Sequence, residues 1–193
     1  RIDVHSMGRL KPSVHEVLMS RGASANLFYL YDTTSDFSVI DPMEHRLLLA
    51  NLIKRSRYFI TFPPKFDRPA EAPGQLDLGL RFFEGAAGGA VMLGTPPNGA
   101  TFKECFDWPD AGIRTTPDGD EIVALIADLD KQPDRLNRIR RDNVGNSLRR
   151  HDWIYRWRRM LEIVGVPISS GVIKRERCLT RLADLVAADG VSH

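Results

Sequence analysis

Residues 79–97 read GLRFFEGAAGGAVMLGTPP, and this stretch decides the fold. Its first half, 79–87, is predicted to be a helix that ends at the glycine pair 88–89, because glycine accepts the left-handed backbone that closes a helix. The apolar run 90–93 has the length of a short buried strand, and the glycine and prolines after it end that strand. The stretch therefore predicts a helix followed by a strand inside a sheet.

The same alternation of short apolar segments and amphipathic segments runs through the first 115 residues. Strands are predicted at 2–7, 26–31 (rich in aromatic residues and expected to be buried), 58–62, 90–93 and 113–115. Helices are predicted between them, at 12–21, from Asp41 onward, at 79–87 and at 101–108. This order is typical of an α/β fold with a Rossmann-like parallel sheet and helices on both faces.

Only helices are predicted after the last strand. A capping box at 118–121 opens an amphipathic helix over 122–129, and further helices are expected at 133–149, 153–164 and 174–188. We therefore divide the chain into a Rossmann-like domain, 1–165, and a C-terminal helical extension, 166–193. The chain opens at Arg1 with an apolar segment and not with methionine, which favours a piece of a longer protein.

The composition argues against several classes of protein. The 193 residues are 42% hydrophobic and 27% charged, with a net charge of +2, which is typical of a globular domain and not of a disordered chain, collagen or a coiled coil. The two cysteines lie far apart and form no CxxC pair, so we expect a reducing cytoplasm and neither a disulfide framework nor a zinc site. No run of about 18 apolar residues predicts a membrane span.

The candidate site follows from the predicted sheet, because ligands bind at the carboxyl ends of parallel strands. The helix that begins at Gly79 offers free amides and a positive dipole end to a phosphate. Arg81, in its first turn, adds a bidentate cation, and Glu84, one turn later, can accept hydrogen bonds from the diol of a ribose. The alternative is that Arg81 and Glu84 form a surface ion pair worth only a few tenths of a kcal/mol.

A second cationic loop follows the first predicted strand. Arg9 and Lys11 come after Gly8 and open the next helix, so they face a phosphate in the functional interpretation and are solvated cations in the alternative. The chain has no GxGxxG, Walker A or GxSxG motif, and its five histidines have no metal-ligand spacing. We therefore expect no metal and no cofactor.

Nine arginines lie between positions 135 and 159. Such a cluster can bind nucleic acid, anionic lipid or an acidic partner, but it is more typical of a solvated helix face or a domain interface. Trp153 and Trp157 are interpreted as core or interface residues rather than as a platform for bases, and no nucleic acid is expected as a partner. Asp107 and Asp110 are expected to cap a loop, with an acidic pair as the alternative.

The stretch 79–164 resembles the C-terminal, nucleotide-sugar-binding half of glycosyltransferases with the GT-B fold, and among them the glycosyl transferases group 1 domain that includes the CgeB-like branch. The resemblance is carried, in the family's order, by GLRFFEGAAGGAVMLG (79–94), FKECFDW (102–108), DGDEIVALIADL (118–129), QPDRLNRIRRDN (132–143) and RRHDWIYRWRRML (149–161). Together the motifs cover nearly half of the chain.

The resemblance implies roles for the candidate residues. Glu84 matches the glutamate that binds the ribose hydroxyls, and Gly79 and Arg81 lie where a diphosphate meets a helix N-terminus. Arg9 resembles the phosphate-binding arginine after the first strand, with Lys11 as its partner cation at a spacing shorter than the usual pattern. Many relatives carry a second glutamate eight residues before the first, where this chain has Leu76, so the stereochemical outcome stays open.

The implied function is that of the donor-binding domain of a bacterial hexosyltransferase in polysaccharide or glycoconjugate synthesis. Its partners are a nucleotide-sugar donor, an unidentified acceptor and an N-terminal acceptor domain that this chain lacks, so the chain alone is expected to be inactive. We expect a cytoplasmic protein, with room for peripheral contact with the inner membrane. The alternatives are a non-catalytic Rossmann-like interaction module, because no complete catalytic constellation is present, and a nucleotide-sugar epimerase on the same fold.

Overall fold

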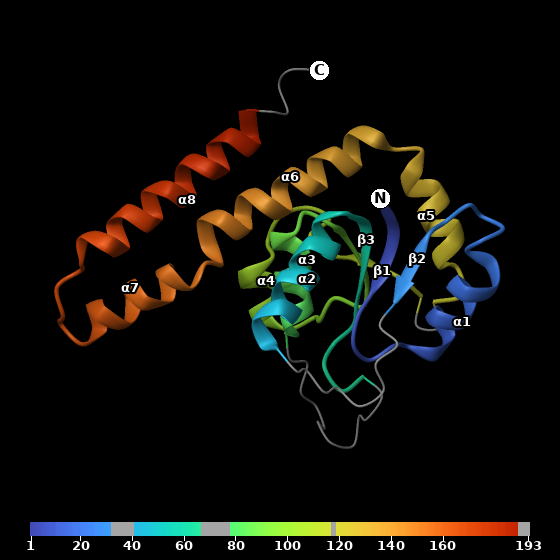
Figure 1. Cartoon of the computed structure of the whole chain (residues 1–193), viewed down its shortest axis with the longest axis horizontal. Coiled ribbons are helices and arrows are strands. Elements are labelled where there is room, and N and C mark those ends of the chain that lie inside the picture. Colours follow the sequence, from blue (N-terminus) through green and yellow to red (C-terminus); the bar gives the residue numbers. More distant parts are fainter. Residues whose placement is uncertain (32–40, 67–77, 117–118, 189–193) are drawn as a thin grey trace.

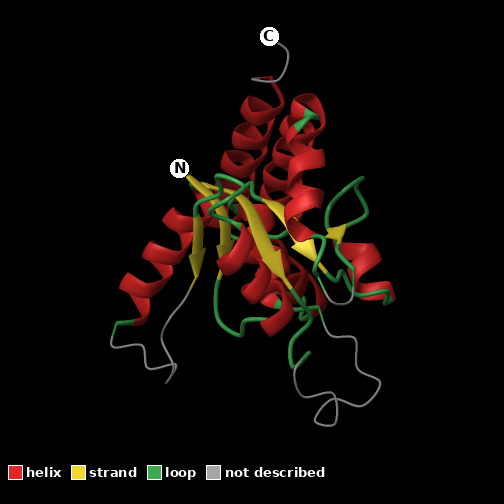
Figure 2. Ribbon diagram, turned by 90° about the vertical axis from the view of Figure 1, so that its right-hand side faces the viewer, coloured by secondary structure: helices red, strands yellow, loops and turns green. Residues whose placement is uncertain are grey.

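The computed structural model describes residues 1–31, 41–66, 78–116 and 119–188. In these ranges five strands form one parallel sheet in the order β2-β1-β3-β4-β5. The strands are β1 (Ile2–Ser6), β2 (Tyr29–Tyr31), β3 (Ser56–Thr61), β4 (Val91–Gly94) and β5 (Ile113–Arg114) (Figure 2). The predicted α/β fold with a Rossmann-like parallel sheet is confirmed.

Helices cover both faces of the sheet (Figure 1). One face carries α1 (Pro12–Arg21) and α5 (Ile122–Asp130), and the other carries α2 (Pro42–Lys54), α3 (Leu80–Ala87) and α4 (Ala100–Cys105). Successive residues of a strand point to opposite faces. Tyr58 and Ile60 accordingly pack with the α1 and α5 layer, whereas Phe59 packs with α2.

Helix α3 lies unusually close to its neighbours because of the glycines that follow its aromatic residues. A Cβ atom at Gly85 would lie 2.9 Å from the ring of Phe59, and one at Gly88 would lie 2.3 Å from Cγ2 of Ile53. The FEGAAGG motif therefore lets α3 pack directly on β3 and α2. Its buried Phe82 is completely covered, so the helix start that carries Arg81 is firmly fixed to the sheet.

The predicted buried strand over 26–31 is wrong in extent and in burial. Strand β2 begins only at Tyr29, and all of its three residues are half-buried. Among the described strands it pairs with β1 alone and lies at the edge of the sheet, so one side of its backbone faces away from the other strands. The aromatic side chains there pack on His15 of α1, with ring centroids 5.7 Å apart for Tyr29 and 4.7 Å for Tyr31.

The helix starts differ in how well the sequence located them. Asp41 caps α2 as predicted, because its carboxylate accepts hydrogen bonds from the amides of Met43 at 2.8 Å and Glu44 at 3.2 Å. Asp118 of the predicted box at 118–121 lies outside the described residues, and Glu121, at the N-cap of α5, makes no side-chain bond to the helix. Its carboxylate instead accepts from the amide of Thr116 at 3.0 Å.

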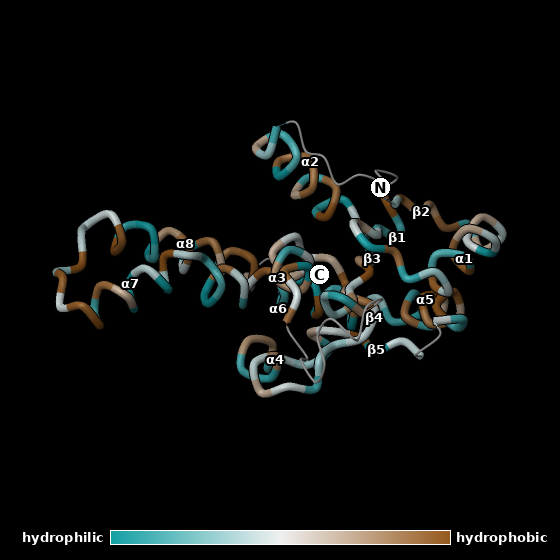
Figure 3. Tube along the Cα trace, turned by 90° about the horizontal axis from the view of Figure 1, so that it is seen from below, coloured by the Kyte–Doolittle hydropathy of each residue, from teal (hydrophilic) through white to brown (hydrophobic). Residues whose placement is uncertain are grey.

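The last three helices form an arm that extends from the sheet (Figures 1 and 3): α6 (Pro133–Arg150), α7 (Trp153–Ile163) and α8 (Ser170–Ala188). The first part of α6 crosses the amino ends of the strands, where the buried Asn143 donates to the carbonyl of Ala90 at 2.9 Å. Helix α8, which begins four residues before its predicted start, packs back along α6.

The arm leaves α7 largely uncovered. Apolar and hydrophilic residues alternate along α7 (Figure 3), a pattern typical of a helix with one buried face. In the described structure, however, α7 contributes no buried residue. Trp153 and Trp157 are 69% and 55% exposed, so the core alternative is wrong for them, and the interface alternative stays a prediction. The apolar face of α7 is a surface of this chain.

Candidate functional site

The carboxyl ends of β1 and β3 lie side by side at the point where the strand order reverses. The chain leaves β1 toward β2 on one side, and it returns across β1 to β3 on the other. In an open parallel sheet, this reversal creates a crevice in which ligands bind. A hollow of about 260 Å³ opens there, lined by Ser6, Met7, Gly8, Arg9, Ile60, Phe62, Pro63, Pro64, Lys65, Phe66 and Arg81. We call it the switch-point hollow.

The switch-point hollow is electropositive. Among the described residues that line it, Arg9, Lys65 and Arg81 carry positive charge, and none is an aspartate or glutamate. Lys11 approaches from the start of α1, where its Nζ lies 5.1 Å from the centre of the Phe62 ring. Cations that converge on a concave surface attract anions.

The guanidinium of Arg81 reaches into this hollow over a backbone turn that only glycine adopts easily. Gly8 has φ of +79°, and a Cβ atom placed on it would lie 3.4 Å from Nη2 of Arg81. Gly79 stands at the N-cap of α3 in an extended conformation, and the first amides of a helix lack carbonyl partners in the preceding turn.

Glu84 is joined to Arg81 but lines a different hollow. Nη1 of Arg81 donates to Oε2 of Glu84 at 2.6 Å, and both side chains are about one-third exposed. Glu84 faces a larger hollow of about 650 Å³ between α2, α3 and the arm. The surface ion pair that the spacing allowed is therefore present, and Arg81 stands on the rim between the two hollows.

Sequence reasoning missed some residues of this site. Lys65 and Phe66 follow the prolines that end β3, in a segment without periodicity, and Phe66 packs on Phe62 with ring centroids 5.3 Å apart. Ser6, which is 4% exposed, lines the hollow from the last position of β1. Its place at the carboxyl end of a predicted strand was the signal that could have found it. Leu76, the departure from the family pattern, lies outside the described residues.

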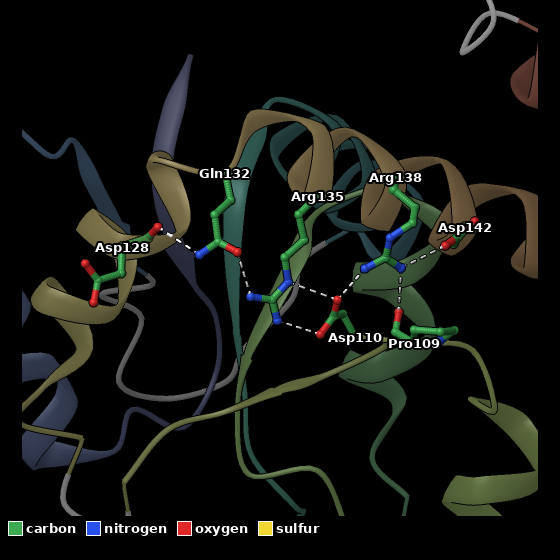
Figure 4. Close-up of polar contacts among 7 residues, drawn as sticks. All are labelled: Pro109, Asp110, Asp128, Gln132, Arg135, Arg138 and Asp142. Carbon is green, nitrogen blue, oxygen red and sulfur yellow. Dashed lines mark hydrogen bonds and ion pairs between the residues drawn. The ribbon is translucent and has the colours of Figure 1, made fainter.

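The arginine cluster of α6 and α7 is largely engaged within the chain (Figure 4). Arg135 donates to both oxygens of Asp110, at 3.0 and 2.7 Å, and Arg138 binds the same carboxylate. These arginines hold the pKa of Asp110 below its usual value. Asp107 binds Arg150 at 2.5 Å. The two aspartates are therefore anchors for α6 rather than loop caps, which corrects the expectation from the sequence.

The arm has further pairs of the same kind. Arg149 donates to Asp184 at 2.7 Å, and Arg158 forms a two-pronged pair with Glu176 at 2.6 and 2.5 Å, which ties α7 to α8. Within the described ranges no group of three or more histidine, cysteine, aspartate or glutamate residues is arranged to hold a metal ion. None of the helices described here combines the length and apolar character needed to cross a membrane.

Comparison with known proteins places the chain in a family. The family model described as glycosyl transferase-like matches residues 41–162, which run from α2 to α7 and make up well over half of the chain. Neither a curated protein nor a solved structure matches the chain. The matched range includes Gly79, Arg81 and Glu84, although the match does not assign roles to them. The chain belongs to the glycosyl transferase-like family, which implies transfer of a sugar from a donor to an acceptor.

Proposed function

We propose that this chain is the donor-binding domain of a bacterial hexosyltransferase of the GT-B fold. The observation that carries the proposal is the switch-point hollow, where Arg9, Lys65 and Arg81 converge at the carboxyl ends of β1 and β3. The family implies a sugar donor, and sugar donors are commonly nucleoside diphosphate sugars. Their diphosphate is the group that such a hollow would recognise.

The diphosphate would lie between the first amides of α3 and the guanidinium groups of Arg9 and Arg81. Backbone amides at a helix start and arginine side chains both bind phosphate oxygens. As the bond to the sugar breaks, negative charge grows on the departing diphosphate, and donors fixed around it stabilise that charge. These residues could perform this task as the chain's own groups, and the proposal includes no metal and no cofactor.

The ribose would bind at Glu84, next to the diphosphate. Arg81 touches Glu84 through Nη1 while its Nη2 lies over Gly8, so one guanidinium spans both parts of the nucleotide site. A diphosphate that draws Arg81 toward the switch-point hollow would free Oε2 of Glu84, and both carboxylate oxygens could then accept from the ribose hydroxyls. The ion pair seen in the structure is in this proposal the resting state of the site.

The acceptor site and the catalytic base would come from a second, N-terminal domain of the same enzyme. In this proposal the cations of the switch-point hollow bind the donor, and none of the described residues that line it is a carboxylate or histidine that could remove a proton from an acceptor. We propose a role in polysaccharide or glycoconjugate assembly in the cytoplasm, with peripheral contact at the inner membrane. The donor's base and sugar would be read by residues beside this hollow.

Calorimetric titration with a panel of nucleoside diphosphates and their sugars tests the proposal. We expect saturable binding that depends on the base. We expect Arg81→Gln and Glu84→Gln to weaken this binding by about 1–3 kcal/mol, because each substitution removes hydrogen bonds that involve a charged group. Arg21→Gln and Glu16→Gln are matched controls, because both residues are exposed on α1, away from the hollow.

Two outcomes would contradict the proposal. One is unchanged nucleotide affinity in both site variants, which would remove Arg81 and Glu84 from the site. The other is a panel without binding, both in this chain and in a longer form of the protein that carries the second domain. Product analysis with the longer form separates sugar transfer from epimerisation of the donor.

A further inference from the structure

A second hollow lies at the amino ends of the strands, where β3 and β4 meet the first half of α6. It has a volume of about 210 Å³ and is lined by Arg1, Arg57, Tyr58, Val91, Asp130, Pro133, Leu136, Asn137 and Arg140. We call it the arginine hollow. It shares no lining residue with the switch-point hollow, which opens at the carboxyl ends of the strands.

Positive charge exceeds negative charge on its walls. Three guanidinium groups line it, against the single carboxylate of Asp130. That carboxylate is already shared, because it accepts from the hydroxyl of Tyr58 at 2.6 Å and forms an ion pair with Arg57. Arg57 also donates to Asp3 at 3.0 Å, so its own charge is balanced within the chain.

Arg140 is the group in excess. It lies half-buried on α6, and no residue in the described parts of the chain forms a hydrogen bond or an ion pair with it. Burial lowers its pKa, and repulsion from Arg1 and Arg57 lowers it further. An arginine keeps its charge in proteins despite such pressures. The structure thus holds a partly desolvated cation beside two others, an arrangement that a bound anion would stabilise.

The geometry points to a binding site for a small oxyanion of the phosphate class, held by Arg140, with Arg1 and Arg57 adding positive charge to its walls. Guanidinium groups bind phosphate oxygens in pairs of parallel hydrogen bonds, and Asn137 adds a neutral side chain on the same wall. Pockets for drug-sized ligands start at roughly 300 Å³. At about 210 Å³ the hollow suits a single phosphate group rather than a whole nucleotide.

This site does not rest on the proposed donor function. The donor would bind at the carboxyl ends of the strands through Arg9 and Arg81, whereas the oxyanion would bind beneath α6 at the amino ends. The two proposals can therefore fail separately, and variants at one edge report on that edge alone.

The test is a titration of the chain with inorganic phosphate at constant ionic strength, followed by calorimetry and by thermal unfolding without nucleotide. An anion that binds only the folded state raises the melting temperature as its concentration rises. We expect Arg140→Gln to weaken phosphate binding by about tenfold or more, since it removes hydrogen bonds to a charged group. Arg141→Gln is the control, because Arg141 is the next residue of α6 and does not line the hollow.

A purely structural arginine would behave differently without phosphate. Because Arg140 has no partner in the described structure and is repelled by two cations, we expect Arg140→Gln to melt no lower than the native chain in phosphate-free buffer. A lower melting temperature there would overturn the proposal. If the glutamine variant is too unstable to measure, Arg140→Lys replaces it, because lysine keeps the charge but cannot form the paired hydrogen bonds of a guanidinium group. Undiminished phosphate binding in Arg140→Lys would also overturn the proposal.

Three further comparisons identify the ligand and the hollow in which it binds. Phosphate stabilisation that disappears in Arg81→Gln and persists in Arg140→Gln would assign the anion to the switch-point hollow and overturn the proposal. Acetate that stabilises as well as phosphate does would overturn the phosphate class. Glycerol phosphate compared with inorganic phosphate distinguishes a phosphate ester from the free ion, and stronger binding of either one, lost in Arg140→Gln, supports the site.

Discussion

At the scale of single residues, Gly8 is the position on which the proposed donor site most depends. Its φ of +79° is a conformation in which a side chain costs about 1–2 kcal/mol. A Cβ atom there would also touch the guanidinium of Arg81. We therefore expect Gly8→Ala both to lower the free energy of unfolding by about 1–2 kcal/mol and to weaken nucleotide binding. Urea unfolding and calorimetry measure the two effects.

Gly165 provides the matched control for this substitution. Its φ is +69°, close to that of Gly8, but no atom of the described structure lies within 4 Å of a Cβ built on it. Gly165→Ala should therefore cost similar backbone strain and leave nucleotide affinity unchanged. Equal loss of affinity in both variants would show that strain, and not the contact with Arg81, is responsible.

Asp110 is the residue whose ionisation should most visibly link stability to pH. Arg135 and Arg138 lower its folded pKa below the ordinary value of about 4, so its contribution is complete above that value and is lost as the pH falls through the folded pKa. We expect Asp110→Asn to lower the free energy of unfolding by about 1 kcal/mol near neutral pH, a partly exposed network being worth little more. Urea unfolding over a series of pH values measures this.

The difference between the native chain and Asp110→Asn should shrink as the pH falls below about 4, because the native carboxyl is then protonated as well. Asp184→Asn is a comparison, since Asp184 also binds an arginine of α6, Arg149, but through a more exposed pair. A difference between the native chain and Asp110→Asn that stays constant down to strongly acidic pH would contradict the role of the charge.

At the scale of elements, one buried amide ties the middle of α6 to the sheet, in addition to the ion pairs of Asp107 and Asp110. Asn143 is fully buried, donates to the carbonyl of Ala90 at 2.9 Å and accepts from Nε1 of Trp108 at 2.8 Å. Asn143→Ala would leave both groups buried without a partner, so we expect a loss of about 2–4 kcal/mol in the free energy of unfolding. Asn146→Ala, which removes only a bond within α6 to the carbonyl of Asp142, should cost less than about 1 kcal/mol.

Urea unfolding of both variants decides this prediction. Equal and small losses would mean that α6 is held by its apolar contacts, such as those of the buried Ile139, and not by the amide. A large loss for Asn143→Ala alone would show that one polar side chain fixes the helix that bears the arm.

The positions of the helices and strands along the sequence were largely predictable, whereas the elements that pack beside each of them in space were not. The glycine pair after 87 and the cap at Asp41 are local signals, so the ends of α3 and the start of α2 could be predicted from adjacent residues. Strand β2 was overextended because an aromatic run does not reveal that its strand lies at the edge of the sheet. The tryptophans of α7 show helical spacing, but spacing does not say whether anything covers that face.

The candidate site divides along the same line. Arg9 and Arg81 could be paired from the sequence because both follow the carboxyl ends of predicted strands, which meet at one edge of a parallel sheet. The partners of Asp110 lie 25 and 28 residues away, and no local pattern links them. Lys65 was missed because its segment has no periodicity. Arg140 was missed because the sequence of an arginine cluster does not show which arginine lacks a partner in the folded chain.

At the scale of the whole molecule, charge and apolar surface are divided among three regions. Cationic side chains gather at both ends of the strands, in the switch-point hollow and in the arginine hollow. The arginines of the arm are mostly paired with carboxylates, and its exposed surface is apolar along α7. From this division we expect the arm to contact an apolar protein surface, such as that of the proposed second domain, rather than nucleic acid.

Helix α7 of the arm should also be among the least protected parts of the described fold. Local opening costs little free energy where few apolar side chains are buried, and in the described structure α7 buries none. We expect the amides of α7 to exchange with deuterium well before those of β3 and β4, which should open only with global unfolding because nearly all of their residues are buried. Hydrogen exchange followed by mass spectrometry measures this, with α3 as an internal reference that buries Phe82 and Ala86.

In a longer form of the protein with the proposed second domain, exchange in α7 should be slower, whereas exchange in β3 and β4 should be unchanged. Protection of α7 equal to that of β4 in the present chain would contradict the uncovered helix, and unchanged exchange in the longer form would contradict a domain that docks on it.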